Sequence, residues 1–282
     1  MAPVFRSPAD VEAMYNAAQM VVRTHERLVN FIKVGQTLAQ IDAFVARTLE
    51  DLGCRSCFLH YRPGRIPPFP SHACLSLNDC VVHGTAGYIT RPIQRGDLLK
   101  IDIGVAKGGW LGDAAWTYSF GPPEPQIRRL MDCGKESLRR GVEQLHPRNT
   151  YSAWARTVQN FVEGECKFHL IRGLGGHGYG RAGNKKPYRD ELHLPPYVSN
   201  VMAGFGTSWS EANMKCEPGT LVAVEPMIAL GTGEITHPPG DPWPILTADG
   251  SMSVHYEHDV LITEAGPRIL TAGLDELDDV IG

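Results

Sequence analysis

A chain of 282 residues with 43% hydrophobic residues is long enough to bury a sizeable core, in one large domain or two modest ones. Its formal net charge of -4 and its scattered lysines and arginines show no footprint for nucleic acid, which we exclude as a partner. It has no run of about 18 apolar residues, and its start, "MAPVFRSPADVEAM", has neither a basic nor an apolar segment, so we expect no membrane span, no membrane partner and no secretory signal.

The cysteines indicate a reducing compartment. There are seven, an odd number spread from Cys54 to Cys216, which is not typical of a disulfide framework, so we expect a cytoplasmic protein. Cys54 and Cys57 form a C-x-x-C, with Cys74 and Cys80 downstream. Without a second C-x-x-C, this pattern favours ordinary buried thiols over a zinc site.

The first half of the chain predicts two helices. Ser7 is a typical N-cap, followed by Pro8 and by Asp10 at the third helical position, and the helix should run to about residue 32. Gly35 ends it, and Thr37 with Gln40 forms a capping box for a second helix. The apolar faces of these helices consist of Val11, Met14, Tyr15, Ala18 and Val22, and of Ile41, Phe44, Val45 and Leu49.

The order of elements then repeats. Strand-like stretches follow at 73–77 and on either side of 107–108, and a turn, "GPPEP", covers 121–125. Two further helices are predicted at about 126–145 and, behind Thr150, at about 152–166, followed by strands in "LVAVEP" and "HYEHDVLIT". The repeat is one of organisation and not of sequence. It predicts an α+β fold with pseudo-duplicated halves at about 7–120 and 124–272, with helices outside an antiparallel sheet.

Two aspartates lie in the apolar stretch "KIDIGVAKGGWLGD" at 100–113. If Lys107 and Gly108 form a two-residue hairpin turn, Asp102 and Asp113 lie directly opposite each other on one face. Two like charges there are destabilising unless a shared proton, a basic side chain or a cation lies between them. A solvated hairpin edge is the alternative.

Three more stretches favour a cation. Glu225 ends the apolar strand of "LVAVEPM", Glu257 lies within "VHYEHDVLIT", and His177 lies among the glycines of "GLGGHGYG". A buried carboxylate costs several kcal/mol unless it is paired. Four carboxylates with one imidazole suit two divalent ions of the Mn, Fe, Co or Zn kind that share bridging carboxylates.

The glycines around His177 also have a rival interpretation. Gly173, Gly175 and Gly178 spell G-x-G-x-x-G behind the apolar "FHLI", which is a pattern of dinucleotide binding. The segment that follows, "YGRAGNKKPYRDE", is a poor helix, so the phosphate-binding context is missing.

The residues resemble the methionine aminopeptidases of type I, two-metal enzymes with the pita-bread fold. Asp102, Asp113, His177, Glu225 and Glu257 stand in the order of that family's metal ligands, and the first two have its spacing. Several short motifs also match that family: "NDCVVHG", "KIDIGV", "GGWLGDAAWTY", "GGHGYG", "EPM" and "YEHDVLIT". The resemblance runs from about Ser7 to Thr271.

The resemblance implies a single catalytic metallopeptidase domain over 1–282 that removes the initiator methionine by a hydroxide activated between two metal ions. Asp102 and Glu257 then contact both ions or lie next to them, Asp113 bridges, and His177 and Glu225 complete the shell of the second ion. Glu225 would also shuttle protons. The implied partner is the N-terminus of a peptide or nascent chain, which allows proximity to the ribosome, and the enzyme is expected to be a monomer.

The resemblance also implies residues that contact the substrate. His83, after the "N-D-x-x-x-H-G" word, matches a substrate-contacting histidine, and His193 in "HLPPYV" matches the one that stabilises the tetrahedral intermediate. Trp243, Cys57 and Cys74 fall where the family lines its methionine pocket. Each of these histidines taken alone would be interpreted as a surface or hydrogen-bonded imidazole.

The chain departs from the family at 62–72, 181–191 and 199–216, three longer stretches that border the substrate mouth in the resembling fold. The metal centre is therefore better supported than the substrate. Two alternatives remain: a pita-bread metallopeptidase of other specificity, such as one acting next to proline, and a non-catalytic binding homologue. The missing extra N-terminal domain argues against the first, and the five ligands argue against the second.

Overall fold

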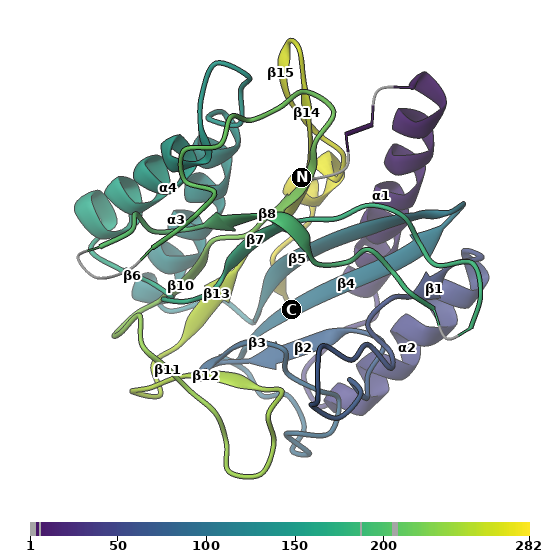
Figure 1. Ribbon diagram of the computed structural model, residues 1–282. Helices are drawn as coiled ribbons and strands as arrows, with labels where there is room; N and C mark the ends of the chain where they lie inside the picture. The colour runs from purple at the N-terminus through teal and green to yellow at the C-terminus, as the bar shows by residue number, and fades with distance from the viewer. Residues whose placement is uncertain (1–3, 6, 187, 205–207) are drawn as a thin grey trace.

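The computed structural model describes residues 4–5, 7–186, 188–204 and 208–282 (Figure 1). Pro187 and residues 205–207, within two of the three longer stretches, lie outside the described residues. In the part of the chain that is described, no helix is both long and apolar enough to cross a membrane.

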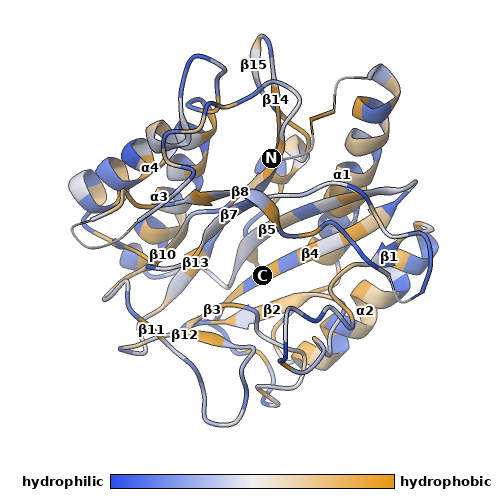
Figure 2. Ribbon diagram, viewed as in Figure 1, coloured by the Kyte–Doolittle hydropathy of each residue, from blue (hydrophilic) through white to orange (hydrophobic). Residues whose placement is uncertain are grey.

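The first two helices begin where their caps predict. Helix α1 covers Pro8–Val29, and the Ser7 side chain accepts a hydrogen bond from the Asp10 backbone N–H at 3.0 Å. It ends earlier than the expected residue 32, with Asn30 as its C-cap. Helix α2 covers Leu38–Asp51, and its capping box of Thr37 and Gln40 is complete. Each helix buries one apolar side, and Figure 2 shows the resulting mixture of hydrophobic and hydrophilic residues.

These helices cover a sheet built on one long hairpin. Its strands follow the order β1–β4–β5–β16, and β2 also pairs with β4. The bounds are Arg55–Ser56 for β1, Cys74–Leu77 for β2, Leu98–Lys107 for β4, Trp110–Phe120 for β5 and Val280–Ile281 for β16. Helix α1 packs against both β4 and β5. The hairpin therefore lies under a helix, and most of its residues are buried.

The second half repeats the pattern of helices followed by strands. Helix α3 covers Pro125–Val142, and α4 covers Tyr151–Gln159. The expected helix at 152–166 is correct in place, but its last part is a π-helix, η1, over Asn160–Cys166. The second sheet has the order β15–β14–β9–β7–β8. Its strands are Gly266–Ile269, His258–Thr263, Leu221–Val224, Gly175–Gly178 and Leu194–Ser199.

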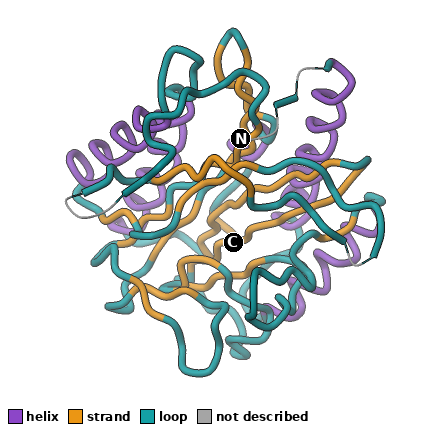
Figure 3. The backbone as a smooth tube through the Cα atoms, in the orientation of Figure 1, coloured by secondary structure: helices purple, strands orange, loops and turns teal. Residues whose placement is uncertain are grey.

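Two small sheets complete the fold, with the orders β13–β10–β6 and β11–β12–β3. Their strands are β3 at Cys80–Val82, β6 at His169–Leu170, β10 at Met227–Ala229, β11 at Ile235–Thr236, β12 at Ile245–Thr247 and β13 at Ser253–His255, and a 3-10 helix, η2, covers Ala272–Glu276. Figure 3 shows the helices on the outside of the strands. The predicted α+β architecture, with helices outside antiparallel strands, is confirmed; the parallel pairing of β16 with β5 adds to it.

Candidate metal centre

The hairpin register differs from the prediction. Lys107 pairs with Trp110, so the turn consists of Gly108 and Gly109, with φ of 58° and 84°. Two positive φ angles define a type I′ turn, which glycines adopt without steric cost, and this moves the turn one residue along the chain. The expected opposition of Asp102 and Asp113 is therefore wrong.

Asp102 pairs with Ala115, and Asp113 pairs with Gly104. The two aspartates lie diagonally, two positions apart, on one face of the hairpin, because residues that alternate by two point to the same side. Both are still directed to the same place. Asp113 is 3% exposed.

The second sheet brings the other three predicted ligands to this place. His177 lies in β7 and pairs with Ala223 of β9, while Glu225 follows the end of β9. Glu257 lies between β13 and β14, and β14 pairs with β9. The Glu257 backbone N–H donates to the Ala115 carbonyl at 2.9 Å, which joins this segment to the first-half hairpin.

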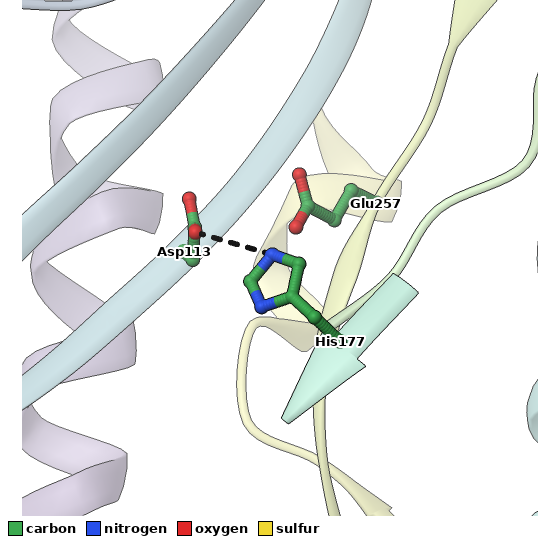
Figure 4. Close-up of side chains that lie close together, drawn as sticks. All are labelled: Asp113, His177 and Glu257. Carbon is green, nitrogen blue, oxygen red and sulfur yellow. Dashed lines mark ion pairs between the residues drawn. The ribbon is translucent and has the colours of Figure 1, made fainter. Parts of the chain in front are cut away.

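The side chains converge from opposite sides. Figure 4 shows Asp113 and Glu257 directed towards the ring of His177. The His177 Nε2 atom lies 4.0 Å from Asp113 Oδ2 and 3.7 Å from Glu225 Oε1. One ligand atom each of Asp113, His177 and Glu257 lies within 4.8 Å of the others, a spacing that can hold a metal ion.

A second group of the same kind contains a residue that the sequence analysis missed. Glu225, His255 and Glu257 also offer ligand atoms within 4.8 Å of one another, so Glu257 belongs to both groups. The His255 Nε2 atom lies 3.2 Å from Glu225 Oε2. His255 ends strand β13, and only its position two residues before Glu257 distinguishes it in the sequence.

The charges at this site are not balanced by the protein. Burial raises the pKa of Asp102 to about 7 and raises the pKa of Asp113, Glu225 and Glu257 well above the ordinary range. The described residues that line the cavity beside them include no lysine or arginine. Asp102 Oδ1 and Asp113 Oδ1 are buried without a hydrogen-bond partner among the described residues. Such a set of oxygen atoms fits divalent cations.

The histidines stay uncharged. Burial lowers the pKa of His177 to about 3 and that of His255 to about 4, so both imidazoles are neutral at pH 7 and fit the role of metal ligands. His177 Nδ1 lies 3.1 Å from the Gly178 carbonyl, which orients the ring with Nε2 free for another partner. Asp259, fully buried, accepts a hydrogen bond from the Asp113 backbone N–H at 2.9 Å and fixes that strand.

A cavity of about 350 Å³ opens beside the acidic residues. Its lining combines the ligand candidates with residues that are largely aromatic and apolar. The predicted residues Cys74, His83, His193 and Trp243 line it, together with Phe58, Tyr61, Pro63, Phe69, Val82 and Leu192, which the sequence analysis did not name as lining residues. This volume suits a small ligand.

Cys57 is the predicted pocket residue that is not among the residues lining the cavity. It is 3% exposed. Its Sγ atom packs against Gly104, where an added Cβ would lie 2.4 Å from it. The close approach of β4 to this thiol explains the glycine opposite Asp113.

Two of the longer stretches border the cavity. The 62–72 stretch contributes Pro63 and Phe69 to the lining. The 181–191 stretch is fixed by Asp190, whose two carboxylate oxygens each lie 2.7 Å from the Arg55 guanidinium. Leu192 and His193 follow directly and line the cavity, so this ion pair helps to position them.

The two rival patterns do not form sites. Gly175–Gly178 is strand β7, so the G-x-G-x-x-G pattern lacks the strand-to-helix turn of a phosphate-binding loop. All seven cysteines are free thiols, and the groups of described residues that could hold a metal ion contain none of them.

Known proteins share this architecture. Residues 12–264 match the model of metallopeptidase family M24. A methionine aminopeptidase from Aquifex aeolicus is 32% identical over 276 residues, which cover 96% of this chain and 99% of that protein. A methionine aminopeptidase structure from Thermotoga maritima superposes with a TM-score of 0.82 at 28% identity, covering 96% and 99% of the two chains. An X-Pro aminopeptidase structure from the same organism shares the fold, with a TM-score of 0.70 and 19% identity, and this chain covers 63% of it.

Proposed function

The chain belongs to metallopeptidase family M24, and from this membership we propose that it is a hydrolase that removes the N-terminal methionine from peptides and nascent proteins. One observation carries the proposal: a cavity of about 350 Å³ is lined both by buried acids and histidines and by aromatic side chains. Similarity to methionine aminopeptidases over nearly the whole chain supports this substrate.

We propose that Asp102, Asp113, His177, Glu225 and Glu257 hold two divalent ions of the Mn, Fe, Co or Zn kind. The two three-residue groups that share Glu257 support two ions rather than one. The unbalanced carboxylates support cations of double charge. When bound, such ions act as Lewis acids and lower the pKa of water.

We assign proton transfer to Glu225. Its carboxylate lies at the cavity, within 3.7 Å of His177 Nε2 and 3.2 Å of His255 Nε2, so it lines the space where water and the peptide bond meet. Without metal, burial raises the pKa of this carboxyl group well above the ordinary range, and bound cations would lower it.

We assign hydrogen bonding to the substrate to His83 and His193. The Tyr61 hydroxyl lies 2.5 Å from His193 Nδ1 and fixes that ring, which leaves Nε2 as the polar atom for the developing oxyanion. Burial lowers the pKa of His83 to about 4, so at pH 7 it offers a neutral N–H or lone pair and not a charge. His83 and Trp243 are in edge-to-face contact with ring centroids 6.2 Å apart.

We propose that the methionine side chain occupies the aromatic side of this cavity. Phe69 packs edge-to-face on Trp243 at 5.0 Å, and the Trp243 indole N–H donates to the Pro67 carbonyl, so these rings form a rigid apolar wall. Cys74 adds a polarisable sulfur. Such a lining suits an unbranched thioether, and a pocket of fixed depth discriminates by about 1 to 3 kcal/mol per methylene.

We further propose that residues 1–282 work as one catalytic domain, with halves at about 7–120 and 124–272, as a cytoplasmic monomer that can act near the ribosome. Hydrogen bonds between the halves support the single domain, such as those between Thr117 and the backbone of His255 at 2.7 and 3.0 Å. The free thiols support a reducing compartment.

The test is peptide hydrolysis with measured metal content. Protein stripped by a chelator should be inactive, two equivalents of Mn, Co or Fe should restore activity, and Met-Ala and Met-Gly peptides should be cut faster than Met-Lys or Met-Trp peptides. Asp113→Asn should lose most activity while its circular dichroism is retained, and Asp132→Asn, on an exposed helix surface, is the control. Faster cleavage of Ala-Pro or Leu-Ala peptides would exclude the methionine assignment, and full activity of metal-free protein would exclude the two-metal centre.

A further inference from the structure

His255 is a buried side chain with an unused nitrogen at the metal centre. It is 2% exposed and ends strand β13. Its Nε2 atom is buried and has no hydrogen-bond partner among the described residues. That atom nevertheless lies 3.2 Å from Glu225 Oε2 and 3.7 Å from Glu257 Oε2.

The backbone holds this imidazole in place. The Thr117 hydroxyl donates to the His255 carbonyl at 2.7 Å and accepts from the His255 N–H at 3.0 Å. On the other side, His255 pairs with Met227 between β13 and β10. Because both sides of the strand are fixed, Nε2 cannot easily turn away from the two carboxylates to find another partner.

The spacing of the three donor atoms is that of ligands around one ion. Two donors that share a Zn²⁺ ion at about 2.0–2.1 Å from each are about 2.8–3.0 Å apart in octahedral geometry and about 3.3–3.4 Å apart in tetrahedral geometry. The distances from His255 Nε2 to Glu225 and Glu257 are close to this range. A hydrogen bond to Glu225 would explain one short distance, but it would not explain why the nitrogen lies near both oxygens without bonding to either.

We propose that His255 is a metal ligand: its Nε2 binds an ion that Glu225 and Glu257 also contact. The inference rests on the proposed two-metal centre and extends its five ligands by one nitrogen. The centre then has two imidazoles for its two ions, those of His177 and His255.

This ligand set changes the metal preference. Carboxylates alone suit Mn²⁺, whereas imidazole suits Zn²⁺, Fe²⁺ and Ni²⁺. With two nitrogens instead of one, the centre should favour Zn²⁺ or Fe²⁺ over Mn²⁺ more strongly than it would with His177 alone.

X-ray absorption of the protein loaded with two zinc ions tests the inference directly. Outer-shell scattering should correspond to one imidazole per zinc in the wild type and to half an imidazole per zinc in His255→Gln. Glutamine keeps a hydrogen-bond donor for Glu225, so a role limited to positioning that carboxylate would survive. His258→Gln is the matched control, because His258 is equally buried and its imidazole contacts Thr271 and Asp275 instead.

Metal titration gives a second readout. His255→Gln should weaken zinc binding at one site by at least about tenfold. The reason is that even the loss of a residue that only hydrogen-bonds to a metal ligand typically costs about 10- to 100-fold in metal affinity. The variant should weaken Mn²⁺ binding less. Half an imidazole per zinc in the wild type would overturn the inference and leave the two-metal centre intact, even if the variant does not fold. A wild type that binds fewer than two zinc ions would overturn the proposed centre and this inference together.

Discussion

Removing the metal ions should make the free energy of unfolding fall as pH rises, because the four carboxyl groups at the centre then have no cation. Asp102 is the group for which the size can be worked out. Burial moves its pKa from 3.8 to about 7, a shift of about 3 units, and each unit corresponds to about 1.4 kcal/mol, so ionising this group in the folded protein costs about 4 kcal/mol.

The sign follows from proton binding. Between about pH 4 and pH 7 the unfolded chain has released the Asp102 proton while the folded chain retains it, so the free energy of unfolding decreases as pH rises and the full loss is reached above about pH 7. Divalent ions bind the folded state and should reverse the loss as their concentration rises.

The assay is urea unfolding of chelated protein from pH 5 to pH 8, compared with Asp102→Asn under the same conditions. The variant keeps the shape of the side chain but cannot ionise. The comparison therefore cancels other titrating groups, such as His25, whose pKa burial lowers to about 3 and whose contribution has the opposite sign. The metal-free variant should be more stable than the wild type by up to about 4 kcal/mol at pH 8 and by a smaller amount, about 1.7 kcal/mol, at pH 5. Equal stability of the two proteins across this range would refute the reasoning.

Three further changes give separate outcomes. His193→Ala should lower kcat by about 10² with bound metal unchanged, because it removes one donor to the oxyanion; a normal kcat would mean that this imidazole lies away from the reacting atoms. Arg55→Ala should lower kcat/KM several-fold without changing metal content. The variant removes the ion pair with Asp190, which helps to hold Leu192 and His193. An unchanged kcat/KM would contradict this role. Gly176→Ala should lower the melting temperature sharply, because the added Cβ would lie 2.2 Å from the Ala223 carbonyl oxygen. Gly87→Ala is the control, since a Cβ there meets no atom within 4 Å. Equal melting temperatures of the two variants would contradict the packing argument.

Local sequence signals predicted those parts of the fold that depend on nearby residues. The capping residues Ser7 and Thr37 fix two helix starts through bonds to groups three residues away, and a sequence shows these directly. The hairpin was missed by one residue because three consecutive residues, Lys107–Gly109, offer two alternative two-residue turns. The structure selects the pair of glycines, since both central positions need positive φ.

The candidate site was predictable where residue type and spacing carry the chemistry. Buried acids in apolar strands indicate a cation from the sequence alone. His255 gave no comparable signal, since a histidine in a strand is usually a hydrogen-bonded core residue, and only the register of β13 with β10 turns it towards Glu225. Tyr61 and Phe69 reach the cavity through irregular segments, whose course no periodicity describes.

The centre lies where the two halves meet, and this location links metal binding to the integrity of the fold. Asp102 and Asp113 come from the first-half hairpin, while His177, Glu225 and Glu257 come from the second half. Neutral hydrogen bonds cross the junction, including those from Glu257 N–H to the Ala115 carbonyl and between Thr117 and the His255 backbone. These bonds hold the ligands in place without a cation, whereas the carboxylates across the same junction repel one another. Bound cations would therefore turn the repulsion between the carboxylates of the two halves into attraction. A variant that binds the ions more weakly should then also separate its two halves more easily, and a variant that binds them more tightly should separate them less easily.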